Sequence, residues 1–192
     1  MGPRLVLLAA LLLAAPTVAR AQRGPAASEM GRRERALRAL VAETPSGTAR
    51  DARIAEMLSS WVDYDAMATR IAGASWAGGD EAQRSAFIAA LRAYVVRRYA
   101  TRARDIVDYR VSVEREDGGA EPVVHVLARS VPHPREEPWE IACRLHRVGG
   151  ELRVIDVETN GTSLVTFLSR RLGARLERGE WDAAAGLLRG HE

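Results

Sequence analysis

The sequence predicts an α+β fold in which helices pack on one face of a twisted four-stranded antiparallel sheet. Three observations lead to this fold class. Apolar residues recur at helical spacing from about residue 37 to residue 104, alternate with polar residues from 109 to 159, and return to helical spacing from 164 to 188. Helices and strands are therefore segregated along the chain in the order helices, strands, helices, which favours α+β.

Four helices are predicted before the strands. Each carries one apolar stripe among polar residues, and Pro45 and Gly73 are typical of boundaries. Asp80, with Gln83 three residues later, is typical of a helix N-terminus and opens a long helix that ends near Arg104. The four stripes contain Leu37, Leu40 and Val41; Ile54, Met57, Leu58 and Trp61; Met67 and Ile71; and Phe87, Leu91, Tyr94 and Val95.

The four strands are predicted at residues 109–114, 122–131, 139–146 and 152–159, where the period changes to two. Gly149 and Gly150 form a two-residue hairpin turn, because glycine takes positive φ without steric cost. The short connections imply an antiparallel meander. Two helices follow, with Leu164, Val165, Leu168, Leu172 and Leu176 on the first and Trp181, Ala184, Leu187 and Leu188 on the second.

Residues 1–21 are predicted to be a secretory signal peptide. A short positive start precedes an unbroken apolar run over residues 5–15, Pro16 ends the run, and Ala19-Arg20-Ala21 has the small-x-small form of a cleavage site. We expect cleavage after Ala21, which would place the mature protein outside the cytoplasm. No other stretch approaches the roughly 20 apolar residues of a membrane-spanning helix, so a soluble mature protein is expected.

The rest of the chain is expected to be one domain behind a short leader. Residues 22–29, which include Gly24 and Pro25, are interpreted as a flexible leader, and residues 30–192 as a single domain. Removal of residues 1–21 lowers the formal charge from +3 to +1, because that segment holds two arginines and no acid. A nearly neutral body disfavours nucleic acid as a partner.

The sequence offers little that would support catalysis or metal binding. Cys143 is the single cysteine, which excludes an internal disulfide and a cysteine-based zinc cluster, and its strand pattern predicts a buried thiol. The four histidines lack ligand spacing. Gly161-Thr-Ser163 lacks the second glycine of a nucleophile elbow, so helix capping fits it better. Asp63 is also expected to cap a helix. No cofactor and no metal are expected.

Several short strings, taken together, resemble one protein family. Val62-Asp-Tyr64 with Met67-Ala68, then Gly73, Trp76, Gln83-Arg84, Phe87 and Tyr99-Ala100, are similar to the pattern F-D-F-x-x-M-A, glycine, tryptophan, E-Q-R-x-x-F and T-Y-A. Val154-Ile-Asp-Val157, Gly161-Thr-Ser-Leu-Val165 and Gly179-Glu-Trp-Asp182 resemble V-x-D-V, G-x-S-L-V and G-G-x-D. In this order and spacing they resemble the MlaC, or toluene-tolerance, family of periplasmic phospholipid carriers from about residue 30 to the end.

The resemblance implies a function in lipid transport without catalysis. A member of this family would be a soluble periplasmic shuttle that carries phospholipid between an outer-membrane lipoprotein complex and an inner-membrane ABC transporter with an MCE-domain subunit. A monomer is expected. Val62, Arg98 and Glu180 depart from the pattern, standing where it has an aromatic residue, threonine and glycine. A carrier of hopanoid or another polycyclic lipid therefore stays open as an alternative.

The predicted architecture provides a place for such a ligand in an apolar cleft between helices and sheet. Burial of acyl chains at about 25 cal/mol per Å² would be sufficient for retention. The candidate lining residues are Met67, Leu91, Tyr94, Val95, Val111, Val113, Trp139, Ile141, Leu164 and Leu168. For any single one of them, ordinary core packing is the favoured alternative, because every such domain needs apolar stripes at these periods. Two other classes also stay open, a small secreted enzyme on a cone-like α+β fold and a protein-binding module without a ligand.

Overall fold

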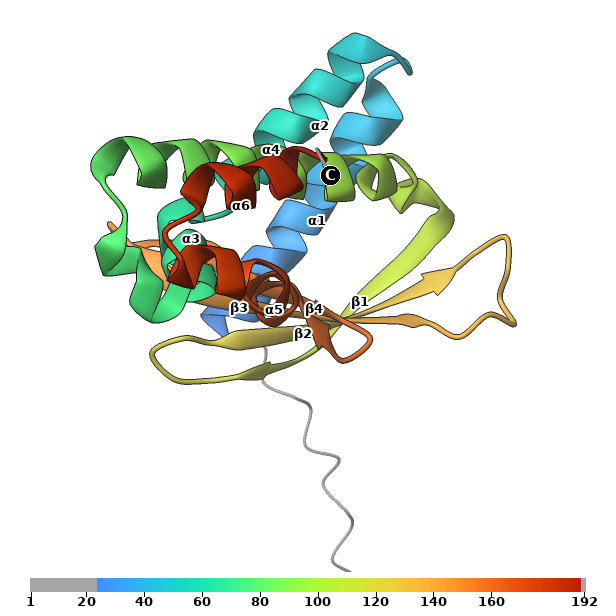
Figure 1. Cartoon of the computed structure of the whole chain (residues 1–192). Helices are drawn as coiled ribbons and strands as arrows, with labels where there is room; N and C mark the ends of the chain where they lie inside the picture. The colour runs from blue at the N-terminus through green and yellow to red at the C-terminus, as the bar shows by residue number, and fades with distance from the viewer. Residues whose placement is uncertain (1–23, 191–192) are drawn as a thin grey trace, which may run out of the picture.

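The computed structural model describes residues 24–190, and its elements follow the predicted order (Figure 1). The predicted signal peptide lies outside these residues. The helices are α1 (Pro25–Glu43), α2 (Thr48–Ser60), α3 (Tyr64–Ala72), α4 (Glu81–Arg104), α5 (Leu164–Glu177) and α6 (Trp181–Arg189), with 3-10 turns η1 (Gly73–Gly78) and η2 (Ile106–Asp108). The strands are β1 (Tyr109–Asp117), β2 (Val123–Ser130), β3 (Trp139–Val148), β4 (Glu151–Thr159) and β5 (Thr162–Ser163). The α+β fold class is confirmed.

The strands form one antiparallel sheet in the order β1-β2-β3-β4-β5. The sequence predicted four of them and missed β5, which is only two residues long. The predicted hairpin turn between β3 and β4 is confirmed, because Gly149 and Gly150 both have positive φ, 57° and 89°. The register shifts between Val113 and Arg115 in β1, which bends the sheet locally.

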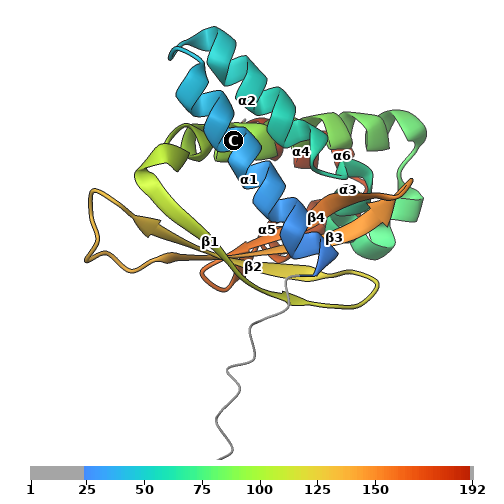
Figure 2. The same ribbon diagram turned by 180° about the vertical axis from the view of Figure 1, so that it is seen from behind.

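The helices gather on one side of the sheet. In Figure 1, α4 and α6 lie side by side above it, and in Figure 2 α1 runs obliquely from the sheet towards α2. On the opposite face of β1 and β3, exposed polar side chains such as Arg110, Glu140 and Arg144 predominate. Within residues 24–190, no helix combines the length and the apolar character needed to cross a membrane.

The buried residues of the described chain form three apolar clusters. The largest joins α3, α4, α5 and α6 around Phe87, Leu91 and Leu168. A second joins the start of α1 to the sheet around Val124 and Leu145. A third joins α1, α2 and the C-terminal part of α4 and includes Leu37, Leu40, Val41, Ile54, Ala100 and Ala103. In the part of the chain that the structure describes, α4 packs on α6, α2 and α3 and on no strand to a comparable extent.

The expected leader differs from the structure from Pro25 onward. Helix α1 begins there, and Ala26 and Ala27 are buried against the sheet. The N-cap residue of α1 is Gly24, which has no side chain to accept a hydrogen bond from the amides of the first turn. The carboxylate of Glu116 in β1 accepts a hydrogen bond from the Ala27 amide at 2.8 Å instead. The leader prediction failed because this cap lies 89 residues away in the sequence.

Side-chain caps fix the starts of three other helices. Asp63 accepts from the Ala66 amide at the start of α3, as predicted. Asp80 and Gln83 form the predicted capping box of α4. Ser163 accepts from the Thr166 amide at the start of α5, which confirms the capping interpretation of Gly161-Thr-Ser163.

A close approach at Gly79 generates a stability prediction. Trp181 is buried between Phe87 and Trp76, with ring centroids 5.7 and 5.9 Å away. A Cβ on Gly79 would meet the Trp181 ring at 2.7 Å, although the Gly79 φ of −80° suits alanine. We expect Gly79→Ala to lower the free energy of unfolding by about 1–3 kcal/mol in chemical denaturation, because a packed core has no spare volume.

The neighbouring glycine is the matched control. A Cβ on Gly78 would meet nothing within 4 Å. Gly78→Ala should therefore leave stability unchanged or raise it by less than about 1 kcal/mol. Equal destabilisation by both substitutions would contradict the proposed contact with Trp181.

Candidate functional site

A cavity of about 340 Å³ lies between the C-terminal half of α4 and the helix-covered face of the sheet, and it is partly open to solvent. Helices α1 to α5 and strands β1 to β4 each contribute at least one residue to its wall. The lining residues are Met30, Leu58, Trp61, Val62, Met67, Val95, Tyr99, Arg102, Ala103, Asp105, Ile106, Tyr109, Val111, Ala128, Trp139, Ile141, Cys143, Val154, Val157, Thr159 and Leu164. The cavity thus joins residues from both ends of the chain.

The two halves of the apolar stripe of α4 face different parts of the fold, which leaves the cavity between the second half and the sheet. In the first half of the helix, Phe87 and Leu91 are fully buried against α3, α5 and α6. From Val95 onward the stripe faces the sheet, and Val95, Tyr99 and Ala103 line the cavity. No other helix fills the space between this part of α4 and the strands in the described chain.

The cavity wall is mainly apolar. Its charged members are Arg102 and Asp105, both exposed side chains near the C-terminus of α4. Burial raises the pKa of the Tyr99 phenol, against the opposing effect of Arg98 and Arg102. Tyr99 is therefore a neutral hydrogen-bonding group at neutral pH. The wall is suited to an apolar ligand rather than to acid–base chemistry.

The structure brings six of the ten predicted lining residues together on this wall. They are Met67, Val95, Val111, Trp139, Ile141 and Leu164. The other four do not line the cavity. Leu91 and Leu168 are buried in the cluster formed by α3, α4, α5 and α6, called here the helical cluster, and Tyr94 packs against it. Val113 packs against the cluster between the start of α1 and the sheet. The apolar period identifies an inward face, but it does not distinguish a packed core from a cavity wall.

Sequence reasoning missed several wall residues. Cys143 was predicted to be buried on the inward face of its strand, and the alternation that placed Trp139 and Ile141 there applied to it as well. Val157 and Thr159 alternate in the same way on β4. Met30 was missed because the first predicted apolar stripe began at Leu37.

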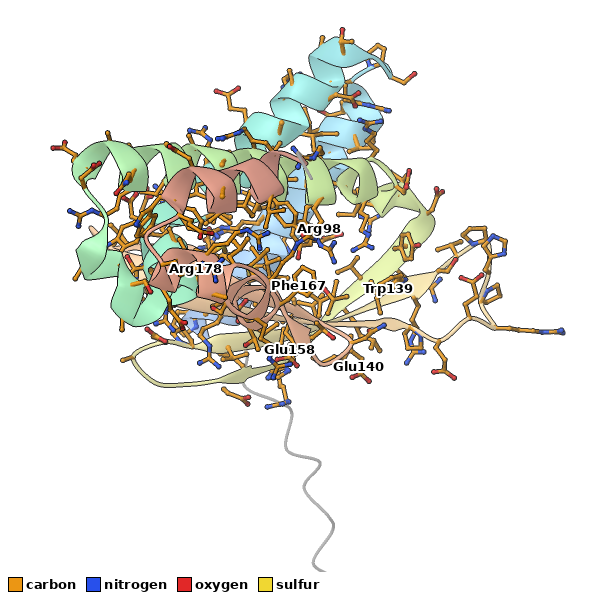
Figure 3. The ribbon with its side chains drawn as sticks, in the orientation of Figure 1. Arg98, Trp139, Glu140, Glu158, Phe167 and Arg178 are labelled. Atoms are coloured by element: carbon orange, nitrogen blue, oxygen red, sulfur yellow. The ribbon has the colours of Figure 1, made fainter. Side chains whose placement is uncertain are left out.

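A second, smaller recess adjoins the cavity and is here called the vestibule. It has a volume of about 250 Å³ and is lined by Arg98, Tyr99, Arg102, Trp139, Thr159, Asn160, Thr162, Ser163, Leu164 and Phe167. Tyr99, Arg102, Trp139, Thr159 and Leu164 line both spaces, so the two are contiguous. Figure 3 shows Arg98 on α4 above Phe167 of α5 and Trp139 of β3. The vestibule is more polar than the cavity.

The remaining polar groups serve structure. His146 Nε2 lies 2.8 Å from the Asp63 carboxylate that caps α3, and His125 Nε2 lies 2.8 Å from Asp117. Asp156 accepts from the Val165 amide and from the Ser163 hydroxyl at the start of α5. Among residues 24–190 there is no group of three or more His, Cys, Asp or Glu placed to hold a metal ion.

An α+β domain with an apolar cavity between a helical layer and an antiparallel sheet defines a class of domain suited to enclosing an apolar ligand. Residues 34–189 match the model of the MlaC protein family, so the chain belongs to that family and the resemblance found in its motifs is confirmed.

A solved structure shares the fold. It is the phospholipid-binding protein from Ralstonia solanacearum, determined in complex with a phospholipid, with a TM-score of 0.61 and 12% sequence identity. The match covers 88% of this chain and 98% of that one. No curated protein matches the chain significantly.

The position of Cys143 on the cavity wall generates a reactivity prediction. Its side chain is buried, and burial raises the thiol pKa to about 12. We expect slow labelling by a small maleimide in native buffer at pH 7, because the reactive thiolate is scarce and the thiol is covered. Labelling should become complete on unfolding in guanidinium chloride. Mass spectrometry follows the adduct, and labelling as fast in native protein as in unfolded protein would contradict this placement.

Proposed function

We propose that the protein binds a phospholipid by burying acyl chain in the cavity beneath α4 and carries it through the periplasm. The observation that carries this proposal is the apolar wall of a cavity that joins every layer of the fold. The family supports it, and so does the phospholipid complex of the Ralstonia solanacearum protein. The transfer would run between an outer-membrane lipoprotein complex and an inner-membrane ABC transporter with an MCE-domain subunit, in either direction.

The energetics of burial suit a carrier. Each methylene removed from water contributes about 0.8 kcal/mol, so a chain of about ten buried methylenes contributes about 8 kcal/mol before the costs of ordering. Such an affinity needs no specific polar contact along the chain. A cavity of about 340 Å³ lies at the lower end of the range for ligand sites, which favours partial enclosure of the lipid.

Carriage fits the site better than catalysis. A hydrolase would need a nucleophile, a base and an oxyanion site converging on one point of the cavity. The wall instead presents Cys143 as a protonated thiol and Tyr99 as a neutral phenol among apolar side chains. A polycyclic lipid such as a hopanoid would also find an apolar wall here, and the identity of co-purified lipid separates it from a phospholipid.

The proposed location rests on the first 21 residues and on the family. Residues 1–21 have the pattern of a secretory signal peptide, and cleavage after Ala21 would release a monomeric domain. A mature N-terminus at Gln22 in protein from the periplasmic fraction would support the proposal.

Two valines on one strand test the lipid site. Val111 lines the cavity, whereas Val113 is half-buried and packs against the cluster between the start of α1 and the sheet. We expect Val111→Trp to fold and to lose most of its co-purified phospholipid, because the indole occupies the space of the acyl chain. Val113→Trp should lower stability by about 1–3 kcal/mol, because it overfills a packed cluster.

The measurement compares melting temperature with lipid content from mass spectrometry of an organic extract. Melting is compared among delipidated proteins, because bound lipid itself stabilises the fold. Phospholipid near one per wild-type protein supports the proposal. A folded Val111→Trp variant with its full lipid content would place the lipid elsewhere.

A further inference from the structure

We propose that the vestibule is a phosphate site, in which Arg98 and Arg102 hold the phosphate ester of the bound lipid. This inference rests on the proposed function, because the acyl chain in the cavity delivers the phosphate to this position. The inference goes further, because it assigns the contacts by which the protein would distinguish a phospholipid from an uncharged lipid.

The two arginines are placed to act together. They are four residues apart on α4, so they lie on the same face of the helix, and both line the vestibule. The Arg102 guanidinium lies 5.1 Å from the centre of the Trp139 ring, which lines both the vestibule and the cavity. This stacking holds one cation at the junction between the polar and the apolar space.

Acidic side chains lie beside the vestibule but do not line it. Within residues 24–190, neither Arg98 nor Arg102 forms an ion pair, and no carboxylate lines the vestibule. Glu140 and Glu158 alternate along the strands with residues that face the cavity, and Figure 3 shows both at the underside of the sheet. Asp105 lines the cavity, whose wall it shares with Arg102, and does not line the vestibule.

The opposite wall complements an anionic ester. Asn160 lies in the turn between β4 and β5, and Thr162 is the first residue of β5. Both side chains can donate hydrogen bonds to phosphate oxygens. Tyr99 adds a phenol, protonated at neutral pH, whose pKa burial raises further above its ordinary value. Phe167, 40% exposed, adds an apolar surface at the same rim. A guanidinium binds phosphate through two parallel hydrogen bonds, which suits the paired arginines.

Both arginines are exposed, so each contact with a free anion would be weak. A lipid whose chain already fills the cavity brings its phosphate to the vestibule at high effective concentration. The site therefore favours a phosphate that is covalently attached to an apolar chain over phosphate in solution. Arg98 stands where the family pattern has threonine, so this vestibule carries a cation that the pattern lacks.

The test uses two soluble short-chain lipids that differ only in the phosphate, dioctanoyl phosphatidic acid and dioctanoylglycerol. Each is titrated into delipidated protein by calorimetry, and inorganic phosphate is titrated alone. The variants are Arg98→Gln, Arg98→Gln/Arg102→Gln and the control Arg84→Gln. Arg84 lies on the same helix with its guanidinium 5.7 Å from the centre of the Trp76 ring, so its loss removes an equivalent charge and stacking contact away from the vestibule.

We expect wild type and Arg84→Gln to bind dioctanoyl phosphatidic acid at least about tenfold more tightly than dioctanoylglycerol. The double variant should lose that preference and keep its affinity for dioctanoylglycerol, and Arg98→Gln should lose part of it. Melting temperatures of the delipidated variants show whether they fold, and Arg98→Gln serves if the double variant does not. Inorganic phosphate should not bind measurably at millimolar concentration.

Three outcomes would overturn the inference. Retention of the preference by the folded variants places the phosphate elsewhere. Equal binding of both lipids by wild type shows that no phosphate site exists, although the proposed carrier function stands. Tight binding of inorganic phosphate alone indicates a free-anion site instead. Failure of wild type to bind either lipid would remove the proposed function itself.

Discussion

The position of α4 above the sheet is the constraint on which the rest of the structure depends. The helix is held by α6, α2 and α3, and its first half is fixed by Phe87 and Leu91 in the helical cluster. The buried Trp181, packed against Phe87 and close to Gly79, locks the start of the helix in place. Because these contacts anchor α4 without any strand, its second half passes over the sheet and leaves the cavity beneath it. Protein interiors are normally close-packed, but here the distance between α4 and the sheet leaves a cavity between them.

The apolar periodicity of the sequence predicted the helices and strands well, because the residues that define each element lie within or next to it in the sequence. Within residues 24–190, stripes and alternation identified the six α-helices and four of the five strands, and the caps at Asp63, Asp80 and Ser163 lie next to the helices they begin. The start of α1 was missed because its cap, Glu116, belongs to a distant strand. The same limit applies to the site. Val111 and Val113 share one alternation pattern, yet Val111 lines the cavity and Val113 packs against the cluster between the start of α1 and the sheet.

Asp63 and Asp156 form hydrogen bonds that hold helices in position. Asp63 caps α3 and also contacts His146 of β3, so it ties the helix to the sheet. Asp156 binds the first turn of α5, whose Leu164 closes one side of the cavity. These hydrogen bonds fix the elements that frame the cavity, while the cavity itself remains apolar. Polar chemistry in this domain serves mainly to position an apolar wall.

In the proposed mode of binding, retention and selection are separated in space. Burial of methylenes is non-directional and proportional to area, so the cavity retains any chain of suitable size and discriminates poorly among lipids. Discrimination needs directional contacts, and the vestibule offers them, because Arg98 and Arg102 line it together with Asn160 and Thr162 of the β4–β5 region. Because those arginines are exposed, their contacts are modest and weakened by salt. A carrier arranged in this way can prefer a phosphate-bearing lipid and still release it, since its polar contacts are weak and exposed to water.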